Sequence, residues 1–238
     1  MDVKALAAEV QRRLRAAASP VRREFTQGYF PSAMRNLGAT TPDLRAIARD
    51  VGRRVRDAAP ADMVRLAHAL IAGTTLEGRQ AAYELLVRHR PALASLTTRE
   101  VERLGEGIDN WASVDTFACL IAGRAWREGR VSDTALRRWA RSKDRWWRRA
   151  AVVSTVPLNK PSHGGSGDPE RTLAICALVS ADQDDMVAKG LSWALRELVA
   201  RDRRAVKRFL KEHDATLAAR VRREVRNKLR SGRKNPRR

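Results

Sequence analysis

Helical periodicity runs along almost the whole of this 238-residue chain and limits it to an all-helical fold. Apolar residues recur at spacings of three and four, as in Leu6, Val10 and Leu14, which places them on one face of a helix. Alternating β-branched runs bounded by turn dipeptides are absent. The pattern predicts helices near 3–17, 20–29, 42–57, 61–73, 75–89, 97–107, 111–128, 132–141, 144–156, 169–180, 183–200, 202–211 and 214–230.

The links between these helices are short, which favours antiparallel neighbours. Helix pairs recur about every 35–40 residues, near the range of HEAT repeats. We therefore predict an all-α fold of HEAT-like helical repeats that form a curved α-solenoid with a concave basic groove. A compact helical bundle is the alternative, which periodicity alone does not exclude. We expect a single domain over 1–230 and a basic, disordered tail over 231–238.

The charge balance indicates a polyanionic partner. The chain has 48 Lys and Arg against 27 Asp and Glu, a net charge of +21. A positive field of this size concentrates nucleic acid around a protein, although an arginine-rich composition can also reside on solvated faces. No stretch reaches the roughly 20 apolar residues of a spanning helix, and the N-terminus lacks the apolar core of a signal peptide. We expect a cytoplasmic protein that does not bind membranes.

No pattern for metal or nucleotide chemistry is present. Cys119 and Cys176 each lie in an apolar stretch without a second ligand at metal spacing, and the four histidines are scattered. Glycine motifs for phosphates or for a catalytic serine are missing as well. We therefore expect neither a metal nor a cofactor. The segment 157–169, PLNKPSHGGSGDP, is rich in Gly, Pro and Ser and is predicted to be a loop.

Three motifs combine tryptophan with charged residues. Tryptophans are usually part of the core, yet in a basic protein an exposed one can contact a sugar or a base. In DNWASVD (109–115), Trp111 and Asp115 fall one helical turn apart on the same face, with Val114 and Ala118 toward the core. The other two motifs are KDRWWRRAA (143–151), with Arg145 and Arg149 on one face, and KGLSWALRE (189–197).

In order and spacing, these motifs resemble the DNA alkylation repair enzymes with HEAT-like repeats, the AlkD-type alkylpurine DNA glycosylases. The resemblance begins at Tyr29 and LGATTPDLR (37–45), continues through NWASVD, WWRRAAV and KGLSWALRE, and covers most of the chain. It departs at Ala112, where family members often carry an acidic residue. The basic C-terminal extension is also longer than in the family.

The resemblance implies a function and a site. It implies excision of cationic N3- or N7-alkylpurines from double-stranded DNA without base flipping. We take a monomer as the default oligomeric state. By resemblance, Asp115 is the catalytic carboxylate, Arg149 the arginine beside it, and Trp111 and Trp193 the aromatic pair around the deoxyribose. The nucleic-acid contacts expected beside them are Tyr29, Arg148 and Lys189.

The chemistry is consistent with these roles. Alkylation makes the purine a good leaving group, and a carboxylate stabilises the oxocarbenium-like sugar that remains. The alternatives are a non-catalytic HEAT-like protein that binds damaged or branched DNA, and a protein–protein scaffold, against which the charge speaks.

Overall fold

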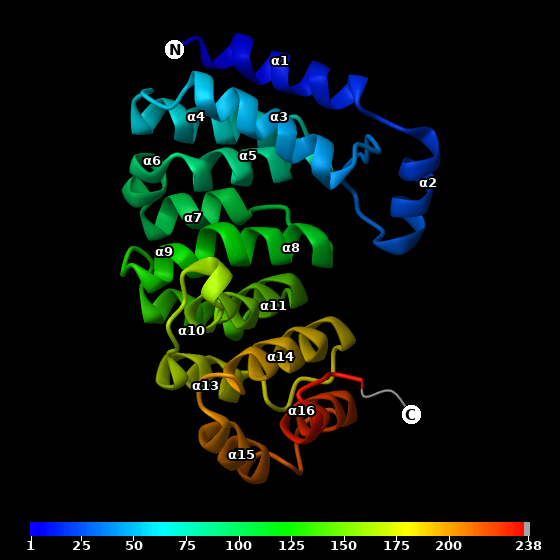
Figure 1. The fold of residues 1–238 in the computed structure, drawn as a ribbon, viewed down its shortest axis with the longest axis vertical. Coiled ribbons are helices and arrows are strands. Elements are labelled where there is room, and N and C mark those ends of the chain that lie inside the picture. The colour runs from blue at the N-terminus through cyan, green and yellow to red at the C-terminus, as the bar shows by residue number, and fades with distance from the viewer. Residues whose placement is uncertain (236–238) are drawn as a thin grey trace. The chain divides into compact units, whose positions relative to one another are not determined.

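The computed structural model describes residues 1–235, and within them every regular element is a helix. The prediction of an all-α fold is confirmed over this range (Figure 1). An isolated bridge between Arg35 and Thr75 is the nearest approach to β structure in the described part. Contacts between residues divide the chain into two units, Met1–Ile121 and Ala122–Arg238.

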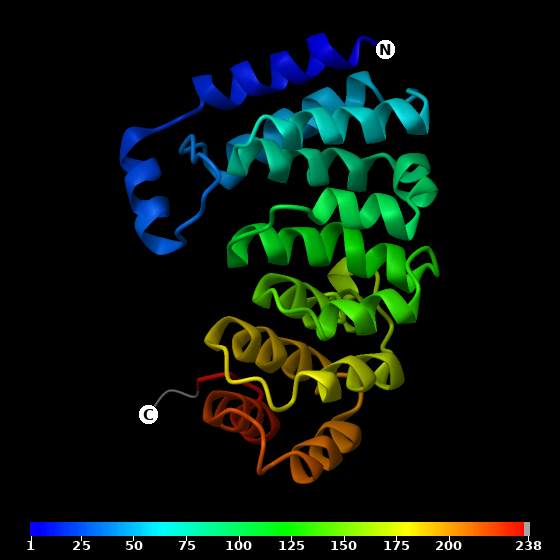
Figure 2. The ribbon, with the colours of Figure 1, turned by 180° about the vertical axis from the view of Figure 1, so that it is seen from behind.

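Unit 1 is a stack of helices, in which several helices pack on elements that are not their neighbours in the chain. Its helices are α1 (Val3–Ala16), α2 (Pro20–Tyr29), α3 (Thr41–Arg54), α4 (Pro60–Ala72), α5 (Leu76–Arg88), α6 (Arg90–Ser95), α7 (Thr98–Gly105) and α8 (Trp111–Phe117). Helix α4 packs on α1 and α5, and α5 packs in turn on α8. The helix α2 differs, since none of its residues is buried, and both views place it beside the stack (Figures 1 and 2).

Unit 2 contains the remaining helices, of which α14 has the most neighbours. They are α9 (Gly123–Arg127), α10 (Asp133–Ala140), α11 (Arg145–Val153), α12 (Val156–Asn159), α13 (Pro169–Leu178), α14 (Asp185–Leu198), α15 (Arg203–Glu212) and α16 (Ala219–Ser231). Helix α14 packs on α11, α12, α13, α15 and α16. A π-helical turn, Ala118–Ala122, follows α8, and the division between the units falls within it.

Capping side chains set most helix starts where the sequence predicts them. The hydroxyl of Ser19 accepts a hydrogen bond from the backbone N–H of Arg22 (3.3 Å), with Pro20 in the first turn of α2. Asp168 accepts in the same way from Arg171 (3.0 Å) at α13. For α3 the cap is Thr40, so the helix begins one residue before the predicted start at 42.

Each unit buries its own apolar core. In unit 1 the fully buried residues come from successive helices, among them Leu14, Val51, Leu66 and Tyr83. In unit 2 Trp126, Val152 and Leu191 are similarly enclosed. At about 25 cal/mol per Å² of apolar surface, these side chains supply the main favourable term for folding. The cores fix the helix faces that remain for solvent and ligands.

Three segments differ from the sequence prediction. Helix α6 was not predicted, and it forms because His89 caps it through Nδ1, which accepts from the N–H of Ala92 (3.0 Å). Within the predicted loop 157–169, α12 takes up the first residues and a 3₁₀ turn, Pro161–His163, follows. The last helix begins at Ala219 and not at 214, because residues 214–218 form turns.

The predicted tail over 231–238 falls partly on residues 236–238, which lie outside the described residues. Before them, Gly232 ends α16 in the left-handed conformation (φ 71°), which glycine adopts without strain. The ammonium group of Lys234 lies 3.4 Å from the carboxylate of Glu224 on α16. Residues 232–235 are therefore attached to the helix that precedes them.

Candidate DNA-facing site residues

Trp111 and Asp115 lie on the accessible face of α8, as the sequence predicts. Both are partly exposed, whereas Val114 and Ala118 are fully buried, so the predicted division of this helix into two faces is confirmed. The side chain of Asn110 caps the helix by accepting from the N–H of Ser113 (2.9 Å). The π-helical turn that follows Asp115 is a feature that often occurs at functional sites and that the sequence did not predict.

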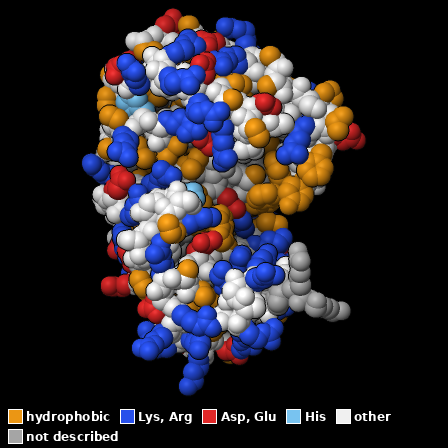
Figure 3. Space-filling view, viewed as in Figure 1, with side chains coloured by type: hydrophobic (Ala, Val, Ile, Leu, Met, Phe, Trp, Pro, Cys, Tyr) orange, Lys and Arg blue, Asp and Glu red, His pale blue; other side chains and the backbone are white. Residues whose placement is uncertain are grey.

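Aromatic rings surround Trp111. The rings of Tyr29 and Phe30 meet it edge to face, with centroids 5.4 and 5.3 Å away. Phe25 stacks on Tyr29 at 5.8 Å. We call Phe25, Tyr29, Phe30 and Trp111 the aromatic cluster. Its outer members are unusually open, with 58% of Phe25 and 61% of Tyr29 exposed, and Figure 3 shows hydrophobic side chains gathered on this side of unit 1.

Asp109 connects the two segments that carry the aromatic cluster. Its carboxylate accepts hydrogen bonds from the hydroxyl of Ser32 (2.7 Å) and the N–H of Ala33 (2.5 Å), just after α2. It also accepts from the side-chain amide of Asn110 (2.9 Å), the cap of α8. The carboxylate therefore ties the end of α2 to the start of α8. The sequence motif alone gives no indication of this link.

Glu77 fixes the segment between α2 and α3 by hydrogen bonds to its backbone. This buried carboxylate accepts from the N–H groups of Leu37 (3.0 Å), Gly38 (2.7 Å) and Ala39 (3.2 Å). Gly38 has φ 91°, and a Cβ there would lie 2.3 Å from the carbonyl oxygen of Ser19. The glycine of the LGATTPDLR motif is thus explained by a close backbone contact that excludes any side chain at this position.

Buried Arg79 fixes the end of α7, the helix that precedes α8. Its guanidinium donates to the carbonyl oxygens of Leu104 (3.1 Å) and Glu106 (2.7 Å), at the C-terminal end of α7. The hydroxyl of Tyr83 donates to the same Leu104 oxygen (2.7 Å). Burial raises the pKa of Tyr83, so this hydroxyl keeps its proton at neutral pH.

Trp193, in unit 2, is oriented by a neighbour on its own helix. Its indole N–H donates to Glu197 of α14 (2.9 Å), and the ammonium of Lys160 lies 5.9 Å from the ring centroid. His163 lies near the same charges: burial lowers its pKa, with the charges of Arg124 and Lys160 acting in the same direction. Lys160 and His163 were not predicted as site residues, because both fall in the segment 157–169 that was predicted to be a loop.

The segment around Lys160 is fixed by hydrogen bonds. Arg201 donates to the carbonyl oxygens of Asn159 (2.7 Å) and Gly165 (3.0 Å), and the side-chain amide of Asn159 donates to Thr172 (2.8 Å). Arg127 donates to the carbonyl oxygen of His163. These bonds hold Lys160 in place beside Trp193.

Arg149 is buried in unit 2, with 5% of its surface exposed. Its guanidinium donates to the carbonyl oxygen of Met186 at the start of α14. Gly190 lies against α11, because a Cβ there would lie 3.1 Å from a methyl group of Val152 and 3.3 Å from one of Val153. The glycine in KGLSWALRE therefore allows α11 and α14 to pack closely. The sequence predicted Arg145 and Arg149 on one basic face of α11; Arg145 is exposed, but the burial of Arg149 corrects the prediction for that residue.

Arg148 and Lys189, which were predicted to contact nucleic acid, each form an ion pair with an aspartate of unit 2. Arg148 donates to Asp182 (2.6 Å) and to the carbonyl oxygens of Ser142 and Lys143. Lys189 lies 2.6 Å from Asp185, and its hydrogen bond holds the pKa of that carboxyl below the usual range. Their roles toward nucleic acid stay predictions.

Several other features bear on the class of protein. Four of the six tryptophans, at 111, 146, 147 and 193, are partly exposed, while Trp126 and Trp139 belong to the core. No group of three or more His, Cys, Asp or Glu suited to a metal ion occurs in residues 1–235. No helix in that range has the length and apolarity needed to cross a membrane. The described chain is thus an all-helical, strongly basic protein with accessible aromatic rings.

Comparison with known proteins identifies the family. The family described as "DNA alkylation repair enzyme" matches residues 10–229, and the chain therefore belongs to it, as the sequence motifs predicted. A solved structure, described as a predicted DNA alkylation repair enzyme from Enterococcus faecalis, has the same fold with a TM-score of 0.73. It is 15% identical, over 90% of this chain and 97% of the other. No match was found among curated proteins. Membership of the family supports a role in DNA repair.

Proposed function

We propose that this protein is a DNA glycosylase that removes N3- and N7-alkylated purines from double-stranded DNA. The observation that carries the proposal is the accessible face of α8, which presents Trp111 and, one turn later, Asp115. A carboxylate beside an indole in a basic protein suits a reaction that develops positive charge on a sugar bound to a polyanion.

The reaction is a hydrolysis at C1′ of the lesion's deoxyribose. The bond from C1′ to the purine nitrogen breaks, and its electron pair leaves with the base and neutralises the charge that alkylation introduced. The sugar becomes oxocarbenium-like, and water then adds to C1′. We assign to Asp115 the stabilisation of the cationic sugar and the acceptance of the proton that the water loses. Little acid catalysis is needed, since the leaving base is already cationic.

The indoles have a complementary role in this proposal. The faces of Trp111 and Trp193 attract a cationic sugar by about 0.5–2 kcal/mol each. Tyr29 and Phe30 hold Trp111, and Glu197 orients Trp193. Such aromatic contacts at the sugar allow excision without drawing the base into a pocket, which is the mode we propose.

We assign Arg149 a positioning role within unit 2. Because it is buried and bonded to the Met186 carbonyl, it is better suited to orienting neighbouring groups than to recruiting a phosphate from solution. Phosphate contacts are then expected from exposed basic side chains. Lys189 and Arg148 contribute to these contacts only if DNA competes with Asp185 and Asp182.

A base-release assay tests the proposal. Purified protein is incubated with a methylated duplex and a metal chelator, and the free bases are separated by chromatography, with an unmethylated duplex as the control. We expect 7-methylguanine or 3-methyladenine to be released. Tight binding of the methylated duplex without release of any base would instead support the alternative, a non-catalytic protein that binds damaged or branched DNA.

A further inference from the structure

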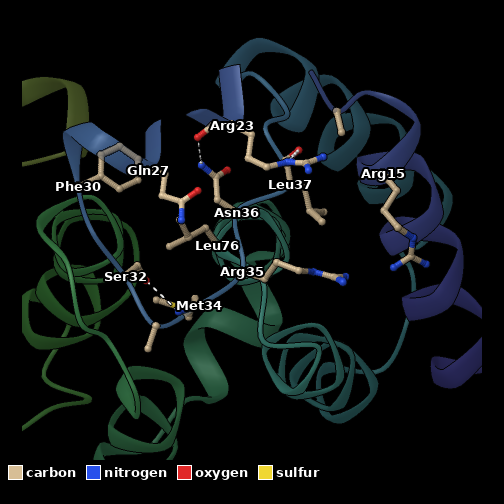
Figure 4. A pocket seen from close by; sticks show the side chains of 12 residues that line it. Arg15, Arg23, Gln27, Phe30, Ser32, Met34, Arg35, Asn36, Leu37 and Leu76 are labelled. Carbon is tan, nitrogen blue, oxygen red and sulfur yellow. Dashed lines mark hydrogen bonds between the residues drawn. The ribbon is translucent and has the colours of Figure 1, made fainter. Parts of the chain in front are cut away.

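Unit 1 contains a cavity of about 530 Å³ on the inner side of α2. It lies between α1, α2, the segment that follows α2, and the first residue of α5 (Figure 4). Its volume is within the 300–1,000 Å³ range of small-molecule sites. We call it the arginine pocket, because Arg15, Arg23 and Arg35 line it.

The three arginines carry charge that the described residues leave uncompensated. No carboxylate in residues 1–235 forms an ion pair with Arg15, Arg23 or Arg35, and the hydrogen bond formed by the Arg23 guanidinium goes to the Leu37 carbonyl oxygen (3.4 Å). By contrast Arg13, also on α1, lies 2.7 Å from Asp50. In Figure 4 the side chain of Arg35 extends toward Arg15.

Like charges brought to one cavity repel each other, so an anion that enters it is bound favourably. Guanidinium groups donate several N–H bonds in a planar fork that matches the oxygens of a phosphate. The arginine pocket thus has the charge and the donors of a phosphate site.

The rest of the pocket is suited to an organic group. Phe30, Met34, Leu37 and Leu76 provide an apolar wall. Gln27 also lines the pocket, and no hydrogen bond to its side-chain amide occurs within the described residues. A ligand with a phosphate, a flat or apolar body and polar edges would use all three parts of the lining.

We propose that the arginine pocket binds a nucleotide unit, with its phosphate at Arg15, Arg23 and Arg35 and its sugar or base on the apolar wall. Phe30 belongs both to this wall and to the aromatic cluster, where its ring lies 5.3 Å from Trp111. A strand that reaches Trp111 therefore passes close to the pocket. The choice of a DNA strand as the source of the nucleotide rests on the proposed function, whereas recognition of the nucleotide does not.

The first experiment measures binding of thymidine 5′-monophosphate to the full chain by calorimetry. We expect the Arg15→Ala/Arg35→Ala variant to bind it at least about tenfold more weakly than the unaltered protein. The matched control is Arg12→Ala/Arg49→Ala, which removes the same charge from α1 and α3 at exposed positions outside the pocket. The control should change the affinity by less than about twofold, because screened distant charges contribute little.

Two further ligands, inorganic phosphate and thymidine, test the contributions of the phosphate and of the nucleoside separately. Inorganic phosphate should bind more weakly than the nucleotide, and thymidine without phosphate more weakly still. Equal loss of affinity in the pocket and control variants would overturn the proposal, as would phosphate binding as tightly as the nucleotide. Thermal melting of both variants checks that they fold, which we expect because all four arginines are exposed.

The source of the nucleotide is tested with methylated duplex DNA. If a strand occupies the pocket, the pocket variant loses more DNA affinity than the control variant. If only the mononucleotide depends on the pocket, nucleotide recognition stands and the source is the free nucleotide. Base release by the unaltered protein is scored separately, so failure of the glycosylase proposal is not confused with failure of the pocket.

Discussion

Asp109 is the residue on which the geometry of the aromatic cluster depends most directly. It joins Ser32 and Ala33, after α2, to Asn110 at the start of α8. Hydrogen bonds to a charged group contribute about 1.5–3 kcal/mol, so replacing Asp109 by Ala should lower stability measurably. It should also let Tyr29 and Phe30 move relative to Trp111.

For the Asp109→Ala variant we expect base release to slow by about tenfold or more, because small displacements of positioning groups have large effects on rate. The measurement is the single-turnover release rate on methylated duplex. The matched control is Asp57→Ala, which removes a carboxylate that is 87% exposed. Release at the unaltered rate from a destabilised Asp109→Ala protein would show that Asp109 has a structural role alone.

For single residues, the sequence predicted the helix face on which a side chain lies better than it predicted how deeply the side chain is buried. Helical spacing was sufficient to place Trp111 and Asp115 on one face, because that face depends on α8 alone. The burial of Arg149 could not be predicted, since it depends on how closely α14 approaches at Gly190. Lys160 was missed because a Gly- and Pro-rich segment gives no periodic signal, although Arg201 and Asn159 fix it in the fold.

Among the elements, α16 is attached to α14 through one buried carboxylate. Glu224, 2% exposed, accepts from the hydroxyl of Ser192 (2.6 Å) and from Arg220 (3.2 Å). Burial alone would raise its pKa, but the Ser192 hydrogen bond and the charges of Lys234 and Arg196 outweigh it, and the net pKa is lowered. A carboxyl with a lowered folded-state pKa stabilises the fold above its unfolded pKa of about 4.3.

Replacing Glu224 by Gln should therefore destabilise unit 2 by about 3 kcal/mol at pH 7, because the surrounding cations lose their counter-charge. The difference from the unaltered protein should persist down to about pH 4 and close below it, as the native carboxyl takes up its proton. Urea unfolding at several pH values measures both effects. The control is Glu212→Gln, whose side chain is 74% exposed. A difference in unfolding free energy between variant and unaltered protein that stays constant into acid pH would contradict a stabilising role for the charge of Glu224.

The helices α1, α2 and α14 were predicted to within two residues at each end, whereas α16 begins five residues later than predicted. The short helices α6 and α12 were not predicted. Helix α6 has six residues and depends on a histidine cap, and α12 has four residues inside a segment whose composition indicates a loop. In both cases the tertiary packing, on α4 and α9 respectively, stabilises what the local sequence does not specify.

For the whole molecule, we expect the net charge of +21 to govern association with DNA. Each phosphate neutralised by the protein releases counterions, so log affinity falls with log salt by about 0.9 per contact. We expect duplex binding to weaken at least about tenfold between about 50 and 200 mM salt. Fluorescence anisotropy with a labelled duplex measures this slope, and a flat response would contradict a phosphate-binding surface.

The family and the all-helical fold were predictable from the chain alone, because motif order and periodicity are properties of the sequence. The arginine pocket was not predictable, since Arg15, Arg23 and Arg35 come from segments with no shared pattern. What brings them together is the path of the chain from α1 through α2, which Glu77 and Gly38 determine.

The central claim is that Asp115 performs the chemistry of excision. The most direct measurement is the release of 7-methylguanine from methylated duplex by Asp115→Asn, alongside its affinity for the same duplex. The account predicts that release falls at least about a hundredfold, while affinity stays within about threefold because only a single charge is removed from a strongly basic protein. Release at the unaltered rate, with DNA binding intact, would contradict it.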